Sequence, residues 1–355
     1  MSDPSNYDPI GTLRGATRLL MTIPLRPLQG DRFQPTGFPS LGAATYQTRD
    51  GTKLLVESAQ SMANRLEMTC WDEAKNKPIG ELDGISHVTV RREKDGEAGG
   101  FLTDSMRESH RLGSPYLLEG EDRQFFDELK RALRASADGP IDRRNLAQTL
   151  LRYDIGCLIH GVFLAKKELA GGRLRVARAL SAVIEASGVS VAASGGVKND
   201  HVNPSGDAKS GFGNVPFSRD EFVAEKIEMF VNLDLAQIRG YGLGEKVEQL
   251  LTLLALFKVR KLIDGDLRLR TACDLEPESR EITASKPEGF VLPSLESLTQ
   301  ALRNLLADDS VKKLMVHTTV TFNDELKKAK ETVKSANDDE PDAAESDEDT
   351  DGTAN

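Results

Sequence analysis

The segment that decides the fold is rich in glycine and proline at first and apolar afterwards. Residues 194–239 read SGGVKNDHVNPSGDAKSGFGNVPFSRDEFVAEKIEMFVNLDLAQIR. Five glycines and two prolines between positions 195 and 216 exclude a helix there, and the segment is too long for a turn. Loops of this length within compact domains are usually functional or disordered. Because Phe230, Leu233 and Leu235 then indicate a buried strand, we expect a polar protrusion on a rigid base.

The composition is that of a globular protein with an acidic end. The chain has 355 residues, of which 39% are hydrophobic, enough for one large core or two modest ones. Its net charge of −10 arises mainly from residues 338–355, which hold nine Asp and Glu and no Lys or Arg. The rest is nearly neutral, so the overall charge says little about partners. We expect a single domain over residues 1–335 and a disordered acidic tail over residues 336–355.

The cysteines and the hydropathy pattern indicate the compartment. Cys70, Cys157 and Cys273 form no CxxC pair, so we expect buried thiols in a reducing compartment. No apolar run reaches about 18 residues, and the N-terminus has no charged-then-apolar signal pattern. The expected location is the cytoplasm, without membrane contact.

Hydrophobic periodicity predicts an α+β fold. Residues 16–28 alternate as a half-buried strand, in which Pro24 marks an edge or a bulge. Further strands are predicted at residues 85–92, 155–164, 267–272 and 313–321. Helices are predicted at residues 57–71, 103–112, 122–136, 143–153, 173–186 and 245–263, and after residue 294. Strands interleaved with helices and long insertions are typical of α+β rather than of a regular βαβ series.

Catalytic patterns are weak in this sequence. The five histidines never form HxH or HExxH, so no metal site and no cofactor are expected. Asp200 and His201 leave open one alternative, a metal-dependent ribonuclease, although two residues in a flexible loop do not fix a catalytic geometry. Residues 240–246 (GYGLGEK) fit a tight turn at least as well as a phosphate-binding loop, because the Walker spacing is missing.

Arginines on predicted strands and helix starts are stronger evidence. Each alone is more often a solvated surface charge, but together they would form a track for a sugar-phosphate backbone, provided that the fold brings them to one face. These residues are Arg18, Arg26, Arg65, Arg239, Arg268 and Arg270.

Several segments together resemble one protein family. They are residues 37–67 (GFPSLGAATYQTRDGTKLLVESAQSMANRLE), the opening segment as far as GYGL, LTDSMRESHRLGSPYL at 102–117, IHGVFLAKKELA at 159–170 and LRLRTACDLE at 267–276. The chain resembles the backbone RAMP subunit, of the seventh Cas family, in CRISPR Cascade complexes of type I-U, later called type I-G. The resemblance spreads over most of residues 13–320 and leaves out the acidic tail.

The resemblance implies a non-catalytic protein that binds CRISPR RNA. It implies an RRM-like (ferredoxin-like) palm with inserted finger and thumb elements, and copies that assemble side by side into a helical filament along the guide. The implied partners are CRISPR RNA, the target DNA strand through guide pairing, further copies of the chain and other Cascade subunits. Type I backbones are not the nuclease, so Asp200 and Asp207 are interpreted as loop residues.

The resemblance also implies which residues contact RNA. A Ser-rich turn that opens a helix grips the RNA backbone in related subunits, and the thumb candidate is residues 194–217. The expected contacts around that turn are Ser58, Gln60, Ser61, Asn64 and Arg65, and near the thumb they are Lys198, Asn199, His201 and Lys209. The expected wedge between bases is Phe212 or Val215.

Overall fold

The structure is a computed structural model that describes most of the chain. Its description covers residues 9–38, 42–94, 97–119, 123–134, 140–206, 210, 213–265 and 267–323. The predicted acidic tail, Lys209, Asp207 and Phe212 lie outside these residues, and of Val215 only the backbone is described. Strands and helices are mixed along the described chain, so the predicted α+β class is confirmed.

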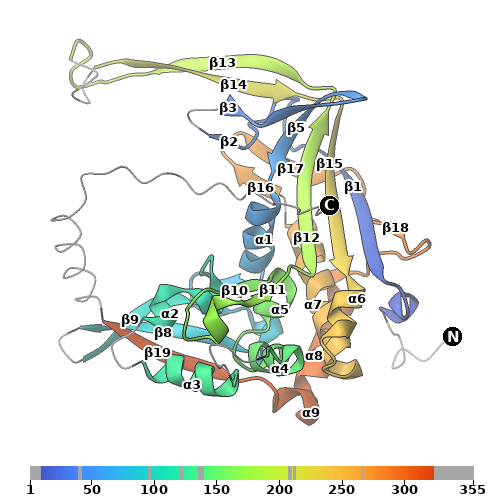
Figure 1. Cartoon of the computed structure of the whole chain (residues 1–355). Helices are drawn as coiled ribbons and strands as arrows, with labels where there is room; N and C mark the ends of the chain where they lie inside the picture. The colour runs from blue at the N-terminus through green and yellow to red at the C-terminus, as the bar shows by residue number, and fades with distance from the viewer. Residues whose placement is uncertain are drawn as a thin grey trace, which may run out of the picture.

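An eight-stranded antiparallel sheet forms the centre of the molecule (Figure 1). The strands follow the order β16 (Leu267–Arg270), β17 (Cys273–Pro277), β1 (Arg18–Pro27), β15 (Lys226–Asp234), β12 (Leu180–Ser187), β5 (Gly51–Glu57) and β4 (Thr45–Thr48), and β18 (Ala284–Lys286) also pairs with β1. Two helices connect strands of this sheet. The chain passes through α1 (Ala59–Met68) between β5 and the later β12, and through α7 (Glu245–Asp264) between β15 and β16.

Strand β1 shows how the sequence builds the sheet. Its alternate residues Leu19, Met21, Ile23 and Leu25 are buried, as the period of two predicted. The strand lies inside the sheet between β15 and the pair β17 and β18, so the predicted edge position of Pro24 was wrong. Since β18 pairs with positions 20–21 and β17 with positions 25–27, the proline, which has no N–H to donate, falls between the two partners.

Helices pack against the sheet and bury one large core. Helix α7 has apolar side chains on most of its circumference, and it is buried against α1, α6 (Leu235–Gly240) and α8 (Leu295–Ala307). Figure 1 shows α1 and α7 beside the lower half of the sheet. Cys70, Cys157 and Cys273 are free and buried, as predicted.

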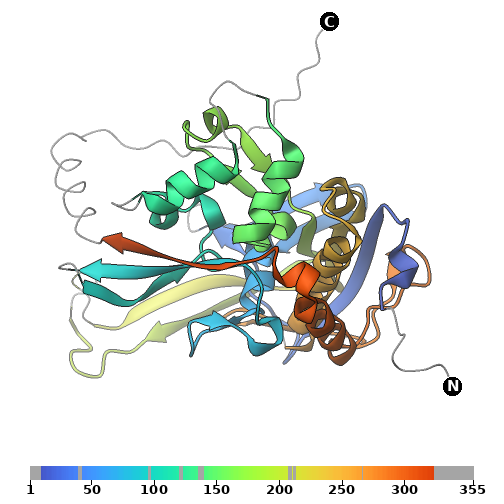
Figure 2. The same cartoon turned by 90° about the horizontal axis from the view of Figure 1, so that it is seen from below.

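A second, three-stranded sheet lies below the central one. Strand β8 (His87–Lys94) pairs with β9 (Glu97–Asp104) on one side and in parallel with β19 (His317–Asn323) on the other (Figure 2). The predicted strand at residues 313–321 therefore exists. The surrounding helices are α2 (Pro115–Leu118), α3 (Gln124–Ala132), α4 (Arg143–Tyr153), α5 (Gly156–His160) and α9 (Asp309–Lys312).

Short strands complete the described chain. The ribbon of β10 (Val162–Leu164) and β11 (Leu174–Val176) lies beside α5 in Figure 1. The segment between β1 and β5 contains β2 (Gly37–Phe38), β3 (Gly42–Ala43) and β4. Strands β6 (Trp71–Asp72) and β7 (Lys77–Pro78) form another small ribbon.

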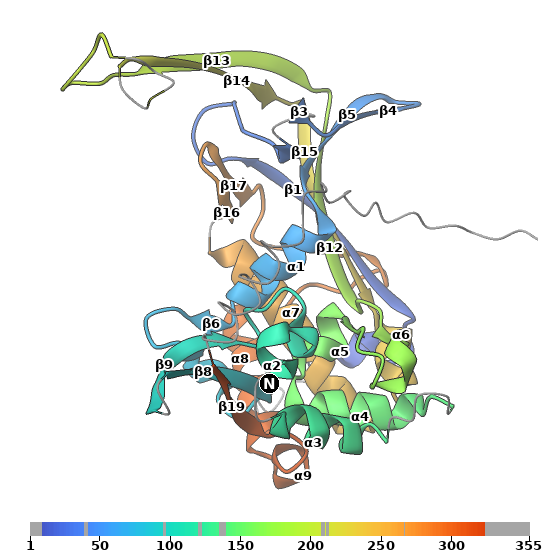
Figure 3. The same cartoon turned by 60° about the vertical axis from the view of Figure 1, so that its left-hand side comes forward.

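The opening segment forms a long two-stranded arm. Strands β13 (Ser190–Lys198) and β14 (Val215–Val223) pair along their whole length, so much of the predicted loop is regular. The arm continues the two central strands β12 and β15 and bends away from the sheet near Gly188 (Figure 3). Gly188 has a positive φ of 62°, a backbone conformation that other residues rarely adopt, so this bend favours glycine. Mutual backbone hydrogen bonds of 2.9 Å between Phe33 and Phe222 hold the base of the arm.

Three predicted elements are wrong. The helix predicted over 173–186 consists of β11 and β12, because alternate residues from Leu180 to Ala186 are buried inside the sheet at a period of two. The strand predicted over 155–164 divides at Gly161, where a positive φ of 79° ends α5 before β10 begins. The segment 103–112 forms the end of β9 and turns, with a short 3-10 helix at Arg111–Gly113, in place of an α-helix.

Candidate nucleic-acid interface

The start of α1 has the local structure that the Ser-rich turn predicted. Ser58 is the N-cap, and its hydroxyl accepts a 3.3 Å hydrogen bond from the backbone N–H of Ser61. Gln60 is exposed in the first turn, donates to Asn64 at 3.3 Å and accepts a hydrogen bond from the Arg178 guanidinium. The exposed amides of Gln60 and Asn64 therefore lie next to a cation on the surface.

Arg65 and Arg270, in contrast, are committed to internal contacts. Both guanidinium groups pair with Glu57, whose side chain is only 2% exposed, with 3.3 Å between Arg65 Nε and its carboxylate. Arg65 also donates to the backbone carbonyls of Arg268, at 3.1 Å, and Leu269. Burial lowers the pKa of both arginines. These contacts attach α1 to β16 and occupy the donors that the phosphate track needs.

The other predicted arginines are dispersed over β1, α6 and β16. Arg18 pairs with Asp234 at 2.9 Å, and Arg26, at the other end of the same strand, pairs with Glu276 at 2.7 Å. Arg239 donates to the carbonyl of Ala16 at 2.6 Å. Arg268 is largely exposed, with 3.8 Å between its Nε and Asp274. The fold therefore does not assemble the six arginines into one uninterrupted track.

A cleft next to α1 is lined by arginines other than the six predicted from the sequence. It encloses about 630 Å³ between α1, the turn before α2, and the β10–β11 ribbon. The residues that line it are Gln60, Ser109, His110, Arg111, Gly113, Pro115, His160, Gly161, Val162, Phe163, Ala165, Arg175, Val176, Ala177 and Arg178. Burial, together with the charge of Arg111, lowers the pKa of Arg178. A cation that is already partly removed from water gains most from an anionic partner.

A second hollow adjoins the cleft across β11. It encloses about 310 Å³, and its lining comprises Arg143, Leu146, Ala147, Arg175, Val176, Ala177, Gln237, Gly240 and Tyr241. None of the described residues that line either hollow is Asp or Glu. We call the two hollows together the basic groove. Their shared residues, 175–177, form the ridge between them, and Gln237 donates to the carbonyl of Ala177 at 2.7 Å.

Buried polar groups support the floor of the groove. Arg111 is 4% exposed and forms two hydrogen bonds with Glu67, of 2.8 Å and 2.5 Å. Lys258 lies 2.8 Å from Nε2 of His160, and Nδ1 of His160 is buried without a hydrogen-bond partner among the described residues. Burial, followed by the charge of Lys258, lowers the pKa of His160 well below its ordinary value. The imidazole is therefore neutral and adds no positive charge to the floor.

The tip of the arm holds the residues considered for catalysis. Asp200 accepts hydrogen bonds from the backbone N–H groups of Val202 and Asn203, each at 2.9 Å, and of Gly213, at 2.8 Å. These bonds lower the pKa of Asp200. Both carboxylate oxygens thus shape the tip, while His201 is exposed beside them. Lys198 and Asn199, at the end of β13, lie on the arm far from the basic groove (Figure 1).

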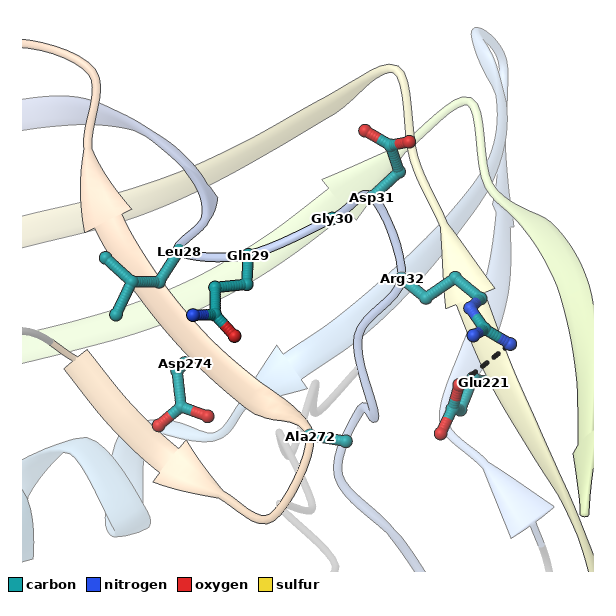
Figure 4. A pocket seen from close by; sticks show the side chains of 8 residues that line it. All are labelled: Leu28, Gln29, Gly30, Asp31, Arg32, Glu221, Ala272 and Asp274. Atoms are coloured by element: carbon teal, nitrogen blue, oxygen red, sulfur yellow. Dashed lines mark ion pairs between the residues drawn. The ribbon is translucent and has the colours of Figure 1, made fainter. Parts of the chain in front are cut away.

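Another hollow lies under the base of the arm and has the opposite charge. It encloses about 470 Å³, and Figure 4 shows Asp31, Glu221 and Asp274 around it, with Arg32 directed at Glu221. The Arg32–Glu221 ion pair measures 3.6 Å. Because its carboxylates would repel a phosphate backbone, this hollow is not part of the nucleic-acid interface.

The sequence reasoning missed the most accessible members of the basic groove. His110, Arg143, Phe163, Arg175 and Arg178 were not among the expected contacts. The alternation in residues 173–176, RLRV, was a signal for a short strand with outward arginines, but the predicted helix concealed it. Nothing in the sequence indicated that residues 110, 163 and 178 would meet at α1.

Comparisons with known proteins show what the chain is similar to. Residues 19–191 match the family model described as CRISPR-associated protein GSU0053 (Cas_GSU0053), which confirms the resemblance predicted from the sequence. A solved chain titled "CRISPR RNA-guided surveillance complex, pre-nicking" is 13% identical, with a TM-score of 0.38, over 82% of this chain and 89% of that one. The crystal structure of Thermofilum pendens Csc2 is 11% identical, with a TM-score of 0.32, over 89% of this chain and 77% of that one. No curated protein matches the chain.

Membrane-spanning helices and metal-binding clusters are absent from the described residues. No helix among them is long and apolar enough to cross a membrane. Within the same residues, no group of three or more His, Cys, Asp or Glu side chains is arranged to hold a metal ion.

Proposed function

We propose that the chain, whose residues 19–191 match the family model described as CRISPR-associated protein GSU0053, is the backbone subunit of a type I-U (I-G) Cascade-type surveillance complex. In this role it binds CRISPR RNA along the spacer, next to further copies of itself and to other Cascade subunits. The target DNA strand contacts the assembly through base pairing with the guide. The protein holds the RNA backbone and leaves the reading of sequence to that pairing.

The strand order supports an RRM-like palm. The four strands β17, β1, β15 and β12 are adjacent and antiparallel in that order. Along the chain, β1 precedes α1 and β12, and β15 precedes α7 and β17, so the two helices serve as the crossovers. This is the order of a ferredoxin-like split βαβ arrangement, in which the first and third strands are central. The remaining elements are insertions into this palm.

The observation that carries the RNA-binding proposal is the basic groove. It brings Arg143, Arg175 and Arg178 to its surface, above the buried Arg111, without a carboxylate among the described lining residues. Lys and Arg side chains provide most of the affinity for a phosphate backbone, independently of its sequence. The exposed amides of Gln60 and Asn64 at the rim supply uncharged donors, which commonly fix register on phosphate and sugar oxygens.

The arm supports assembly into a filament. Most of β13 is exposed, including Val191 and Val197, and Val202 at the tip is 95% exposed. A lone two-stranded hairpin is marginally stable in water, and it gains stability when its apolar side chains are covered. We infer that a neighbouring copy of the chain covers the arm, with the tip as the thumb that meets the guide RNA.

The ribonuclease alternative has little support from the tip. The backbone hydrogen bonds to both oxygens of Asp200 give it a structural role in the tip and lower its pKa, which makes the carboxylate a weaker general base. The adjacent His201 has a single acidic neighbour in sequence and no other expected ligand. The proposed function is therefore non-catalytic.

RNA binding is tested with the full-length protein. We expect a guide-length RNA to co-purify when the chain is co-expressed with its CRISPR array and neighbouring genes. The double variant Arg175→Gln, Arg178→Gln of the purified protein should bind a labelled single-stranded RNA about tenfold more weakly or worse. The slope of the logarithm of its binding constant against the logarithm of the salt concentration should become shallower by roughly 1.4, since each lost phosphate contact removes about 0.7. Arg26→Gln, which removes a cation that pairs with Glu276, serves as the matched control.

Two results would contradict the proposal. The basic groove would be excluded if the double variant bound RNA as tightly as the Arg26→Gln control. Cleavage of labelled RNA with Mg²⁺ or Mn²⁺, abolished by Asp200→Ala, would instead support the ribonuclease.

A further inference from the structure

The β10–β11 ribbon presents an aromatic side chain to the basic groove. In β10, Val162 and Leu164 are buried, whereas Phe163 between them faces outward and is 54% exposed. Among the aromatic residues whose side chains the structure describes, Tyr46 is the only other exposed one. It is 37% exposed and lies on β4 at the edge of the central sheet. A single exposed Phe is unremarkable by itself, so its neighbours decide what it can bind.

Arg175 lies directly across the ribbon from Phe163. The two are cross-strand partners in the antiparallel pairing of β10 with β11, and both face the groove. Side chains at such positions are neighbours, with Cβ atoms about 5 Å apart. Arg175 is exposed and makes no ion pair or side-chain hydrogen bond with any residue that the structure describes. It differs in this from the six arginines predicted from the sequence, which all have partners.

The backbone fixes this pair in place. A Cβ on Gly161 would lie 2.7 Å from the carbonyl of Val176, and a Cβ on Gly113 would lie 2.7 Å from the carbonyl of Phe163. Both sides of the ribbon are therefore packed against their surroundings without room for an added side chain. His160, which precedes the ribbon and lines the same cleft, keeps Nδ1 without a partner among the described residues.

An exposed aromatic ring lies beside a guanidinium that has no partner among the described residues, in a groove whose described lining holds no carboxylate, and this combination suits one class of ligand. Apolar groups alone would not require the cations, and a phosphate alone would not require the ring. An unpaired nucleotide matches both groups, because its base has a π-face that can stack on the ring and its phosphate is an anion that can pair with the guanidinium. Base stacking on aromatic side chains is a common mode of single-strand recognition.

We propose that Phe163 stacks on one unpaired base and that Arg175 binds the phosphate of the same or the adjacent nucleotide. This inference rests on the proposed function, because it places one nucleotide of the bound single strand in the basic groove. It adds a fixed position for a base in a groove whose other proposed contacts are to the RNA backbone. The same chemistry would suit guide RNA or a separate strand of DNA, and the experiment distinguishes them.

The experiment measures the affinity of the full-length protein for labelled 20-nucleotide single strands of RNA and of DNA over a range of salt concentrations. Phe163→Leu should weaken binding about 5- to 100-fold, and the factor should persist at high salt, because stacking is not electrostatic. Phe163→Trp should retain affinity. Arg175→Gln should weaken binding mainly at low salt. The slope of the logarithm of the binding constant against the logarithm of the salt concentration should become shallower by roughly 0.7. Tyr46→Leu is the matched control for an exposed aromatic ring outside the groove.

Each outcome either supports the inference or overturns it. A larger effect of Phe163→Leu on RNA than on DNA identifies the guide as the source of the base, and the reverse identifies a DNA strand. If Phe163→Leu bound both RNA and DNA as tightly as the Tyr46→Leu control does, the stacking site would be refuted even though the wild type binds. If Phe163→Leu reduced self-association, measured by ultracentrifugation, without changing affinity, the ring would be a protein contact and the inference would be wrong. Failure of the wild-type protein to bind any single strand would instead refute the proposed function.

Discussion

Glu57 lies buried between two arginines, and this single carboxylate changes the role of the residues around it. Arg65 was expected to grip RNA because it stands one turn after Ser61, in the helix that the Ser-rich turn opens. Its guanidinium is instead occupied by Glu57 and by carbonyls of β16, and its side chain is only 26% exposed. A group with its donors already used gains little from a phosphate.

We therefore predict that Arg65→Ala destabilises the protein more than it weakens RNA binding. Removing one partner of a buried carboxylate leaves that charge less compensated, so the free energy of unfolding should fall by about 1–3 kcal/mol. Arg175→Ala, an exposed residue without such a partner, should change it by less than about 0.5 kcal/mol. Urea unfolding followed by circular dichroism measures both. Unchanged unfolding of Arg65→Ala together with weaker RNA binding would restore the role predicted from the sequence.

The buried Asp154 predicts a pH dependence of stability. Burial, followed by the charge of Glu67, raises the pKa of Asp154 from 3.8 to about 6. Between pH 4 and 6 the folded protein thus holds a proton that the unfolded chain has released. The contribution of this group is favourable at low pH and declines by roughly 2–3 kcal/mol as the pH rises through 6.

Asp154→Asn removes this titration and provides the test. The difference in unfolding free energy, variant minus wild type, should be more positive at pH 7 than at pH 4.5, because other groups contribute equally to both proteins. Denaturant titrations at the two pH values measure it. A difference that does not change with pH would show that Asp154 is ionised throughout this range.

At the scale of elements, the arm is the part most clearly exposed for a partner. Its two strands are held by their mutual pairing and by the contact of Phe33 with Phe222 at the base. Few of its side chains contribute to the core, so changes along its outer length should leave folding intact.

We predict that Val197→Glu weakens assembly without lowering stability. Val197 is 54% exposed on β13, where a charge would oppose contact with a neighbouring copy. Val291→Glu introduces the same charge at a valine of similar exposure, 46%, outside the arm. Sedimentation on long single-stranded RNA should show smaller assemblies only for Val197→Glu, and the thermal midpoints of both should remain within a few degrees of wild type. Equal assembly of the two variants would exclude the arm as the contact.

The elements also show where sequence patterns succeed and fail. The period of two in β1 and the long apolar α7 are local signals, and both were predicted correctly. Strand β12 was mistaken for a helix because Leu180, Val183 and Ile184 also fit a period of 3.6. Its true neighbours, β15 and β5, are distant in sequence, and their pairing decided the conformation.

At the scale of the whole molecule, class and family could be predicted, whereas the surface could not. Charge patterns identify arginines but not their partners, and Glu57, Asp234 and Glu276 pair with four of the six that were expected to bind RNA. The basic groove requires α1, the turn before α2 and the β10–β11 ribbon to meet in space. No single segment contains that information. The clearest sign of the basic groove in the sequence is the alternation of residues 173–176.

The parallel strand β19 has a consequence for the order of folding. It closes the smaller sheet through contacts such as that of Thr89 with His317, which are 228 positions apart. Pairings between distant segments form slowly, because a long loop must be closed before they contribute any stability. While the chain is being synthesised, the β8 edge therefore remains unpaired until nearly all of the described residues have left the ribosome. During that interval the exposed edge is a site at which a nascent chain can associate with another protein or with a chaperone.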